Sequence, residues 1–195
     1  DDIPAALMQS DWSSDVLKAG ASQPSFTFER GFTDIGQYQI LTGCVMDRLR
    51  LSVRPDRLVS GKLSVLGKSS TLASSSLDAS PTAAASNDPM DSFSGSLTEG
   101  GAAIGIVAGL DLVIDNGLEQ AFVIGDAEAE ALLAGSSRIT GEIVTYFEDA
   151  GLLEKFVDRS ESSLTITFSG AGGSLAFELP RIVYTGAENP ALGAG

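Results

Sequence analysis

Two neighbouring segments alternate apolar and polar residues, and this alternation constrains the fold more than any other feature of the sequence. In residues 45–54 leucine and valine alternate with arginine and serine, and residues 58–68 alternate in the same way after Pro55 and Asp56. A period of two puts successive side chains on opposite faces of a strand. The sequence therefore predicts an antiparallel pair of strands with one solvated face.

Strand patterns recur along the rest of the chain. They predict strands at 25–30, 104–115, 118–125, 138–147, 162–168 and 174–184. Asn116 and Gly117 separate two of these strands, and Asn-Gly favours a type I′ hairpin turn, in which both central residues have positive φ. The glycine-rich residues 169–173 predict a second hairpin.

Three short helices are also predicted, at 3–10, 126–135 and 149–158. In the second, Asp126 is a candidate N-cap and Gly135 a candidate C-terminal stop. The expected fold is mainly β: an antiparallel β-sandwich or open barrel with two or three short helices.

Residues 69–96 differ in composition from the segments on either side. They contain ten serines, with Met90 and Phe93 as their bulkiest apolar residues. Such a segment buries too little apolar surface to form a core of its own. We expect a single domain over residues 1–195 with a long Ser-rich loop at 69–103.

Composition excludes several kinds of chemistry. The chain has no histidine, which excludes Ser-His-Asp and Cys-His catalysis and His-ligated metals. Its single cysteine, Cys44, excludes an intrachain disulfide, and its strand-like context favours a buried structural thiol. The net charge of −14 argues against a protein that grips nucleic acid by its phosphates. The longest apolar run at the centre, residues 102–110, is too short for a membrane-spanning helix.

Three motifs resemble binding sites or interaction surfaces. Residues 61–69 end in Gly-Lys-Ser, but five residues separate the two glycines where a phosphate-binding loop has four. The acidic residues around 111–119 do not follow the alternate spacing of a calcium loop and are interpreted as solvated surface. No catalytic residue, cofactor or metal site is predicted. One local excess of basic residues is present, formed by Arg48, Arg50, Arg54 and Arg57. These arginines either contact an acidic neighbouring subunit or keep the strand face soluble.

Several segments, in this order, resemble the siphophage-type major tail tube protein, the β-rich family that builds long non-contractile phage tails. They are WSSDVLKAGASQPSFTFERGF (12–32), YQILTGCVMDRLRLSVRPDRLVSGKLSVLGKSS (38–70), GLDLVIDNGLE (109–119), ITGEIVTYFEDAGLLEKF (139–156) and LPRIVY (179–184). Similar proteins carry more chain before Trp12 and after Tyr184, the pattern expected of a fragment of a longer chain.

The resemblance implies a structural virion protein rather than an enzyme. It implies homo-oligomeric, typically hexameric rings whose sheets join across subunits, and rings that stack into a tube conducting DNA during ejection. The implied partners are other copies of the chain, tail proteins such as the tape measure and tail terminator, and DNA passing without specific binding, with no membrane. The implied location is the virion tail, and the host cytoplasm before assembly. Met90 and Phe93 become candidate anchors on an adjacent subunit, and the four arginines candidate subunit contacts.

Two other classes remain open from the residues alone. A monomeric β-sandwich that binds glycans, such as an adhesin, needs an aromatic platform, but Trp12, Tyr38, Tyr146 and Tyr184 are scattered along the chain. An acidic hydrolase needs two carboxylates facing one cleft, which sequence cannot show.

Overall fold

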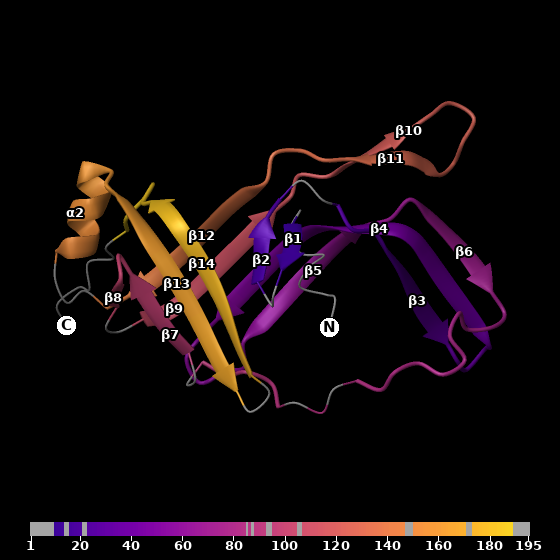
Figure 1. Cartoon of the computed structure of the whole chain (residues 1–195), viewed down its shortest axis with the longest axis horizontal. Coiled ribbons are helices and arrows are strands. Elements are labelled where there is room, and N and C mark those ends of the chain that lie inside the picture. Colours follow the sequence, from indigo (N-terminus) through magenta and orange to yellow (C-terminus); the bar gives the residue numbers. More distant parts are fainter. Residues whose placement is uncertain are drawn as a thin grey trace, which may run out of the picture. The chain divides into compact units, whose positions relative to one another are not determined.

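The computed structural model describes residues 10–13, 16–20, 23–84, 86, 88–92, 95–104, 107–146, 150–170 and 173–188. The described residues are mainly β, with 59% in strands and 5% in helix, and their sheets are antiparallel (Figure 1). The described strands form no closed barrel. None of the helical structure in these ranges is long and apolar enough to cross a bilayer.

The strands in chain order are β1 (Ser10–Ser13), β2 (Val16–Ala19), β3 (Phe26–Phe32), β4 (Gln37–Val53), β5 (Ser60–Leu66), β6 (Ser69–Ala73), β7 (Gly95–Glu99), β8 (Ala102–Ala103), β9 (Val107–Asp115), β10 (Glu119–Phe122), β11 (Ala129–Leu133), β12 (Arg138–Thr145), β13 (Glu161–Gly170) and β14 (Gly173–Val183). The helix α2 (Gly151–Asp158) lies between β12 and β13. The chain forms two compact units. Unit 1 comprises Asp1–Ser52, Ser60–Ala85 and Asp111–Gly141, and unit 2 comprises Val53–Val59, Ser86–Leu110 and Glu142–Gly195.

Unit 1 is organised around β4, a strand of 17 residues. β3, β5 and β6 all pair with β4 in antiparallel register, and β5 runs along its second half from Val45 opposite Leu66 to Ser52 opposite Ser60. This is the pair that the alternation predicts, and it is confirmed. The buried residues of β4 are Cys44, Val45, Met46, Leu49 and Leu51.

Cys44 lies in this core and is 2% exposed. Burial raises the pKa of its thiol, because the charged thiolate is poorly solvated there. The prediction of a buried structural thiol is confirmed.

Unit 2 is organised around β13. Its sheet has the order β14-β13-β7-β8, so β13 has a strand on each side. Leu164, Ile166 and Phe168 alternate along β13 and are all buried. The β13–β14 pairing runs to Gly170 opposite Gly173, which confirms the second predicted hairpin.

The predicted loop at 69–103 is wrong at both ends. Residues 69–73 form β6 on β4, residues 95–99 form β7 on β13, and residues 102–103 form β8 on β7. A serine-rich segment gains backbone hydrogen bonds when it adds to a strand that is already in place, and composition alone does not show this. Irregular structure remains in the described residues between Ala73 and Gly95.

The hairpin predicted at Asn116 and Gly117 is also wrong. Only Gly117 has positive φ, and the Asn116 backbone N–H instead donates to the Asp47 carbonyl at 2.8 Å. The chain continues into β10, which pairs with β11 rather than with β9.

Of the predicted helices, only the one at 149–158 is confirmed, as α2. The helix predicted at 126–135 is wrong, because the carboxylate of Asp126 accepts the Glu128 N–H in a turn and β11 follows. The helix predicted at 3–10 lies outside the described residues except for its last position. That position, Ser10, is the first residue of β1.

Candidate interaction surfaces

The β10–β11 hairpin, here called the arm, ends in an exposed apolar turn. Among the described strands, these two pair only with each other, and the pairing shifts register between Ala121 and Phe122. Phe122 is 60% exposed, Val123 48% and Ile124 fully. Figure 1 shows the arm as a two-stranded ribbon closed by a loop. We call Phe122–Gly125 the tip; an exposed cluster of large apolar side chains of this kind is typical of an interaction surface.

The base of the arm is fixed by Asn116, which is 2% exposed. Its side-chain amide donates to the Met46 carbonyl at 3.0 Å, and its amide oxygen accepts from Ser137 at 3.3 Å. Asp47 holds the chain two residues further on, since its carboxylate accepts the Leu118 N–H at 3.0 Å. These bonds set the direction in which the arm leaves β9.

Two further contacts hold the arm beyond its base. The Gln120 side chain donates to the Gly67 carbonyl at 2.7 Å, and the Ala129 N–H donates to the Lys68 carbonyl at 3.1 Å. At Gly135, a Cβ atom would lie 2.3 Å from the Gly117 carbonyl oxygen. Gly135, predicted to stop a helix, is therefore required for close approach of two backbones.

Arg48 lies beside the base and forms an ion pair with Asp115 of its own chain. Its Nε donates to Asp115 Oδ2 at 2.9 Å, and its Nη2 contacts the same oxygen. The Gly117 N–H and the Arg48 guanidinium lower the pKa of the Asp115 carboxyl. Arg48 thus has an acidic partner within its own chain.

The four arginines are divided between the two units. Arg48 and Arg50 belong to unit 1, and Arg50 is exposed on β4. Arg54 and Arg57 belong to unit 2. Arg54 Nη1 donates to the carbonyls of Val53 and Leu110, at 2.9 and 3.2 Å.

The second pair of sequence candidates is Met90 and Phe93. Met90 is half-buried within unit 2, where its carbonyl accepts the Val59 N–H at 3.0 Å. Its Cγ lies 3.6 Å from the position that a Cβ on Gly170 would occupy. Phe93 lies outside the described residues.

Unit 2 contains a groove of about 430 Å³, here called the apolar groove. Buried Leu110, Ile166 and Phe168 contribute to its lining, along with Val53 and Val107. The sequence does not predict this groove, because its walls come from four separate chain segments. The apolar run at 102–110 is the one feature of the sequence that falls on this groove.

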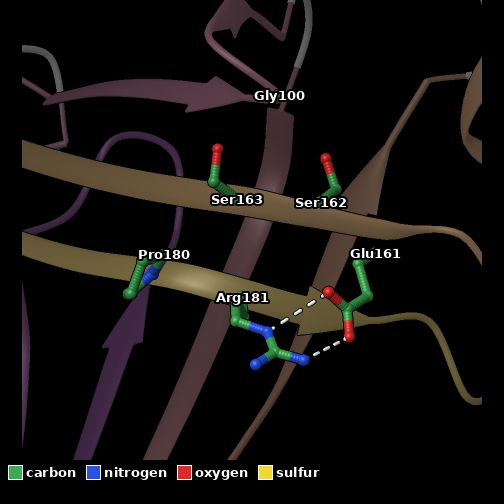
Figure 2. Close-up of a pocket in the computed structure, with 6 residues that line it drawn as sticks. All are labelled: Gly100, Glu161, Ser162, Ser163, Pro180 and Arg181. Atoms are coloured by element: carbon green, nitrogen blue, oxygen red, sulfur yellow. Dashed lines mark hydrogen bonds and ion pairs between the residues drawn. The ribbon is translucent and has the colours of Figure 1, made fainter.

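A second, polar pocket of about 310 Å³ lies on the β13–β14 hairpin. Figure 2 shows Arg181 and Glu161 facing each other from these two strands, with donor–acceptor distances of 3.2 and 2.6 Å. The Arg181 hydrogen bonds lower the pKa of Glu161. The described part of the chain holds no group of three or more potential metal ligands, and neither pocket joins residues in a known catalytic arrangement.

A buried carboxylate links α2 to the sheet of unit 2. Glu99 on β7 is 6% exposed, and Lys155 of α2 forms an ion pair with it. Burial alone would raise the pKa of Glu99, but hydrogen bonds from Lys155 and Ser162 and the Lys155 charge hold that pKa below its usual value. Burial and the nearby Glu99 charge raise the pKa of Tyr184 to about 12.

Comparison with known proteins places this arrangement in a family. None of the curated proteins compared matches the chain. A protein-family model described as phage tail tube protein matches residues 1–195, the whole length. The mainly β, antiparallel architecture agrees with the fold that the sequence resemblance implies. The chain belongs to the phage tail tube protein family.

Proposed function

We propose that copies of this chain assemble into hexameric rings, that the rings stack into a tube, and that DNA passes through this tube during ejection. Family membership makes the protein a structural component of the virion tail. The observation that carries the proposal is the match of the tail tube family over the whole chain.

Exposed strand edges support self-assembly. β14 is 11 residues long, largely exposed, and has β13 as its one neighbour among the described strands. An edge of this length offers unpaired backbone groups to another chain. Joining sheets across subunits covers such edges, and Pro180 limits where a partner strand pairs.

The charge distribution suits a conduit for DNA. Fourteen of the 26 acidic residues lie between Asp78 and Lys155, where Arg138 and Lys155 are the basic residues. Exposed arginines repeated around and along a tube would form a ladder of phosphate-binding sites that retards DNA. We expect carboxylates to dominate the lumen. We also expect most of the four arginines to lie at subunit contacts: Arg48, Arg50, Arg54 and Arg57.

The proposal also gives the protein's partners and its location before assembly. The protein acts without catalysis, stays in the host cytoplasm before assembly, and contacts the tape measure and tail terminator proteins. The residues from the 69–103 segment that lie outside strands become ordered against neighbouring subunits, with Met90 and Phe93 as contacts.

Negative-stain electron microscopy of the purified full chain, alone and with tail-assembly partners, tests the proposal. Rings or tubes are expected. Featureless particles, together with light scattering that gives only monomer at high concentration, would contradict it and favour a monomeric binding module.

A further inference from the structure

We infer that Arg50 and Lys62 of one copy, here called the basic pair, bind the carboxylates of Glu128 and Glu130 on the arm of a second copy. This inference rests on the proposed self-assembly and names two surfaces that meet in it. The occupant of the basic pair is thus an acidic segment of this same chain.

The register of β4 and β5 brings the two cations of the basic pair together. Arg50 lies directly opposite Lys62 on the two antiparallel strands, and both residues are exposed. Side chains opposed in this way have Cβ atoms about 4.5–5.5 Å apart, and like charges in that position are destabilising. Carboxylates bound over the basic pair would remove this repulsion.

The neighbouring residues on the two strands supply no carboxylate for the basic pair. On one side Ser52 lies opposite Ser60, and on the other side Arg48 lies opposite Ser64. Arg48 is itself a cation, and it already pairs with Asp115. Among the described residues, no ion pair joins either member of the basic pair to an acidic group.

The arm carries exposed carboxylates and no basic residue. Glu128 and Glu130 are exposed on either side of Ala129, which is 5% exposed. Ala129 lies against its own chain, whereas the flanking carboxylates remain in solvent and form no ion pair within the described part of the chain. Residues 69–137, which include the whole arm, contain no lysine or arginine.

The two surfaces match in spacing as well as in charge. Residues two positions apart in an extended chain are about 6.5–7 Å apart, so Glu128 and Glu130 are separated by slightly more than the two members of the basic pair. The long side chains of all four residues span this difference. A guanidinium binds one carboxylate through two parallel hydrogen bonds, and an ammonium binds the other as a point charge.

The arm of the same copy is attached too far away to supply these carboxylates. β5 and β6 follow one another along β4, so the chain from Lys62 to Lys68 is extended and spans about 20 Å. The arm is held at the far end of this stretch, where the Ala129 N–H donates to the Lys68 carbonyl. The carboxylates over the basic pair therefore come from another molecule.

Carboxylates of a second copy fit the basic pair better than phosphates of DNA do. Nucleic acid is held by clusters of lysine and arginine, and the strand residues beside the basic pair are three serines and the already paired Arg48. The chain as a whole has a net charge of −14, which repels DNA and leaves many acidic groups without a cation.

The interface that results is heterologous, because the basic pair meets an arm rather than another basic pair. Each copy carries both surfaces, so every copy can bind two neighbours. Head-to-tail contacts of this kind build closed rings or open stacks, whereas a contact between identical patches stops at a dimer.

Two charge-reversed variants test the contact directly. The first is Arg50→Glu with Lys62→Glu, and the second is Glu128→Lys with Glu130→Lys. Each variant alone places like charges at the contact, so it should associate at least tenfold more weakly than wild type in analytical ultracentrifugation at about 0.15 M salt. A 1:1 mixture should regain association, because each reversed surface then meets its opposite on the other variant.

Asp34→Lys with Glu188→Lys is the matched control for the second variant. It changes the net charge by the same amount at exposed carboxylates outside the arm, and it should associate as wild type does. Circular dichroism identifies a variant that fails to fold, and crosslinking of the wild-type chain then keeps the inference testable. A carbodiimide should join the Lys62 amine to Glu128 or Glu130, and a mixture of isotope-labelled and unlabelled chains should show that the joined peptides come from different copies.

The outcomes separate this inference from the proposed function. Rings that form equally well from each variant alone, without the Lys62 crosslink, overturn the contact and leave the tube intact. Normal association of the first variant, with loss of its binding to a short DNA duplex, would make the basic pair a phosphate site and also overturn the contact. Absence of any wild-type association overturns both.

Discussion

The two hairpins β13–β14 and β10–β11 have the same local architecture but different surroundings. β13 has β14 on one side and β7 on the other, and its Ile166 is 1% exposed. Within the described part of the chain, the strands of the arm pair only with each other, and Ile124 at the turn is fully exposed. Alternating sequence is enough to form a hairpin, but a third strand and a facing layer are needed to bury its apolar side chains. The arm therefore has the composition of a buried element in an exposed position.

We expect the largest difference in the free energy of unfolding when an isoleucine is replaced by alanine in each of the two hairpins. Ile166→Ala should lower the free energy of unfolding by about 3–4 kcal/mol, because it leaves a cavity in a packed core. Ile124→Ala should change it by less than about 0.5 kcal/mol, because no intrachain contact is lost. Urea unfolding of the monomeric subunit measures both. Equal losses would mean that the arm is buried within its own chain.

The next effect concerns the base of the arm. Asn116→Ala removes the amide that satisfies the buried Met46 carbonyl and should cost about 2 kcal/mol. Ser137→Ala removes only the 3.3 Å bond to the same side chain and should cost about 0.5 kcal/mol. Hydrogen exchange should show faster exchange along β10 and β11 in the first variant alone. Unchanged exchange in Asn116→Ala would show that the arm does not depend on this anchor.

A smaller effect is expected at the Glu99–Lys155 pair. Lys155→Met leaves a buried carboxylate without its cation. We expect the free energy of unfolding to fall by about 1–2 kcal/mol at pH 7. The effect is smaller than for a fully buried pair because the Lys155 side chain is one-third exposed to solvent. The folded-state pKa of Glu99 is lowered, so the stabilisation is present above the unfolded value near 4.5 and is lost as pH falls through the folded value.

The difference between wild type and Lys155→Met should accordingly shrink below about pH 4.5. Urea unfolding at a series of pH values measures it. Glu99→Gln, which removes the charge, is the matched control and should abolish this pH dependence. A constant difference down to pH 3 would exclude Glu99 as the titrating group.

The smallest effect is spectroscopic. Tyr184 has its pKa raised to about 12, so one of the three tyrosines should ionise well after the others in an ultraviolet titration. Because the raised pKa favours the protonated form in the fold, this contribution to stability is lost as pH rises through the folded value. Tyr184→Phe should remove the late step. A late step that persists in this variant would belong to another tyrosine.

The sequence predicted the elements whose signals are local. The pair β4–β5, the hairpin β13–β14 and the helix α2 each carry their own periodicity. The hairpin turn predicted at Asn116 is wrong because of long-range contacts. Its side-chain amide and its backbone N–H donate hydrogen bonds to the carbonyls of Met46 and Asp47, about seventy residues away. Residues 126–135 are rich in alanine, glutamate and leucine, yet pairing with β10 overrides their helix propensity.

The candidate surfaces were harder to predict than the fold. Residues 118–125 were identified as an apolar strand, but exposure of the tip depends on which neighbours are missing, and period-two patterns do not contain that information. The apolar groove joins residues from β9 and β13 that are more than fifty positions apart. The arginines, which looked like one cluster, fall in two separate units.

A cryo-electron microscopy reconstruction of the assembled wild-type chain tests the central claim most directly. The account predicts hexameric rings that stack into a tube, in which the exposed edge of β14 of each copy pairs with a strand of the next copy. Featureless monomers, or rings in which the β14 edge of every copy stays unpaired, would contradict it.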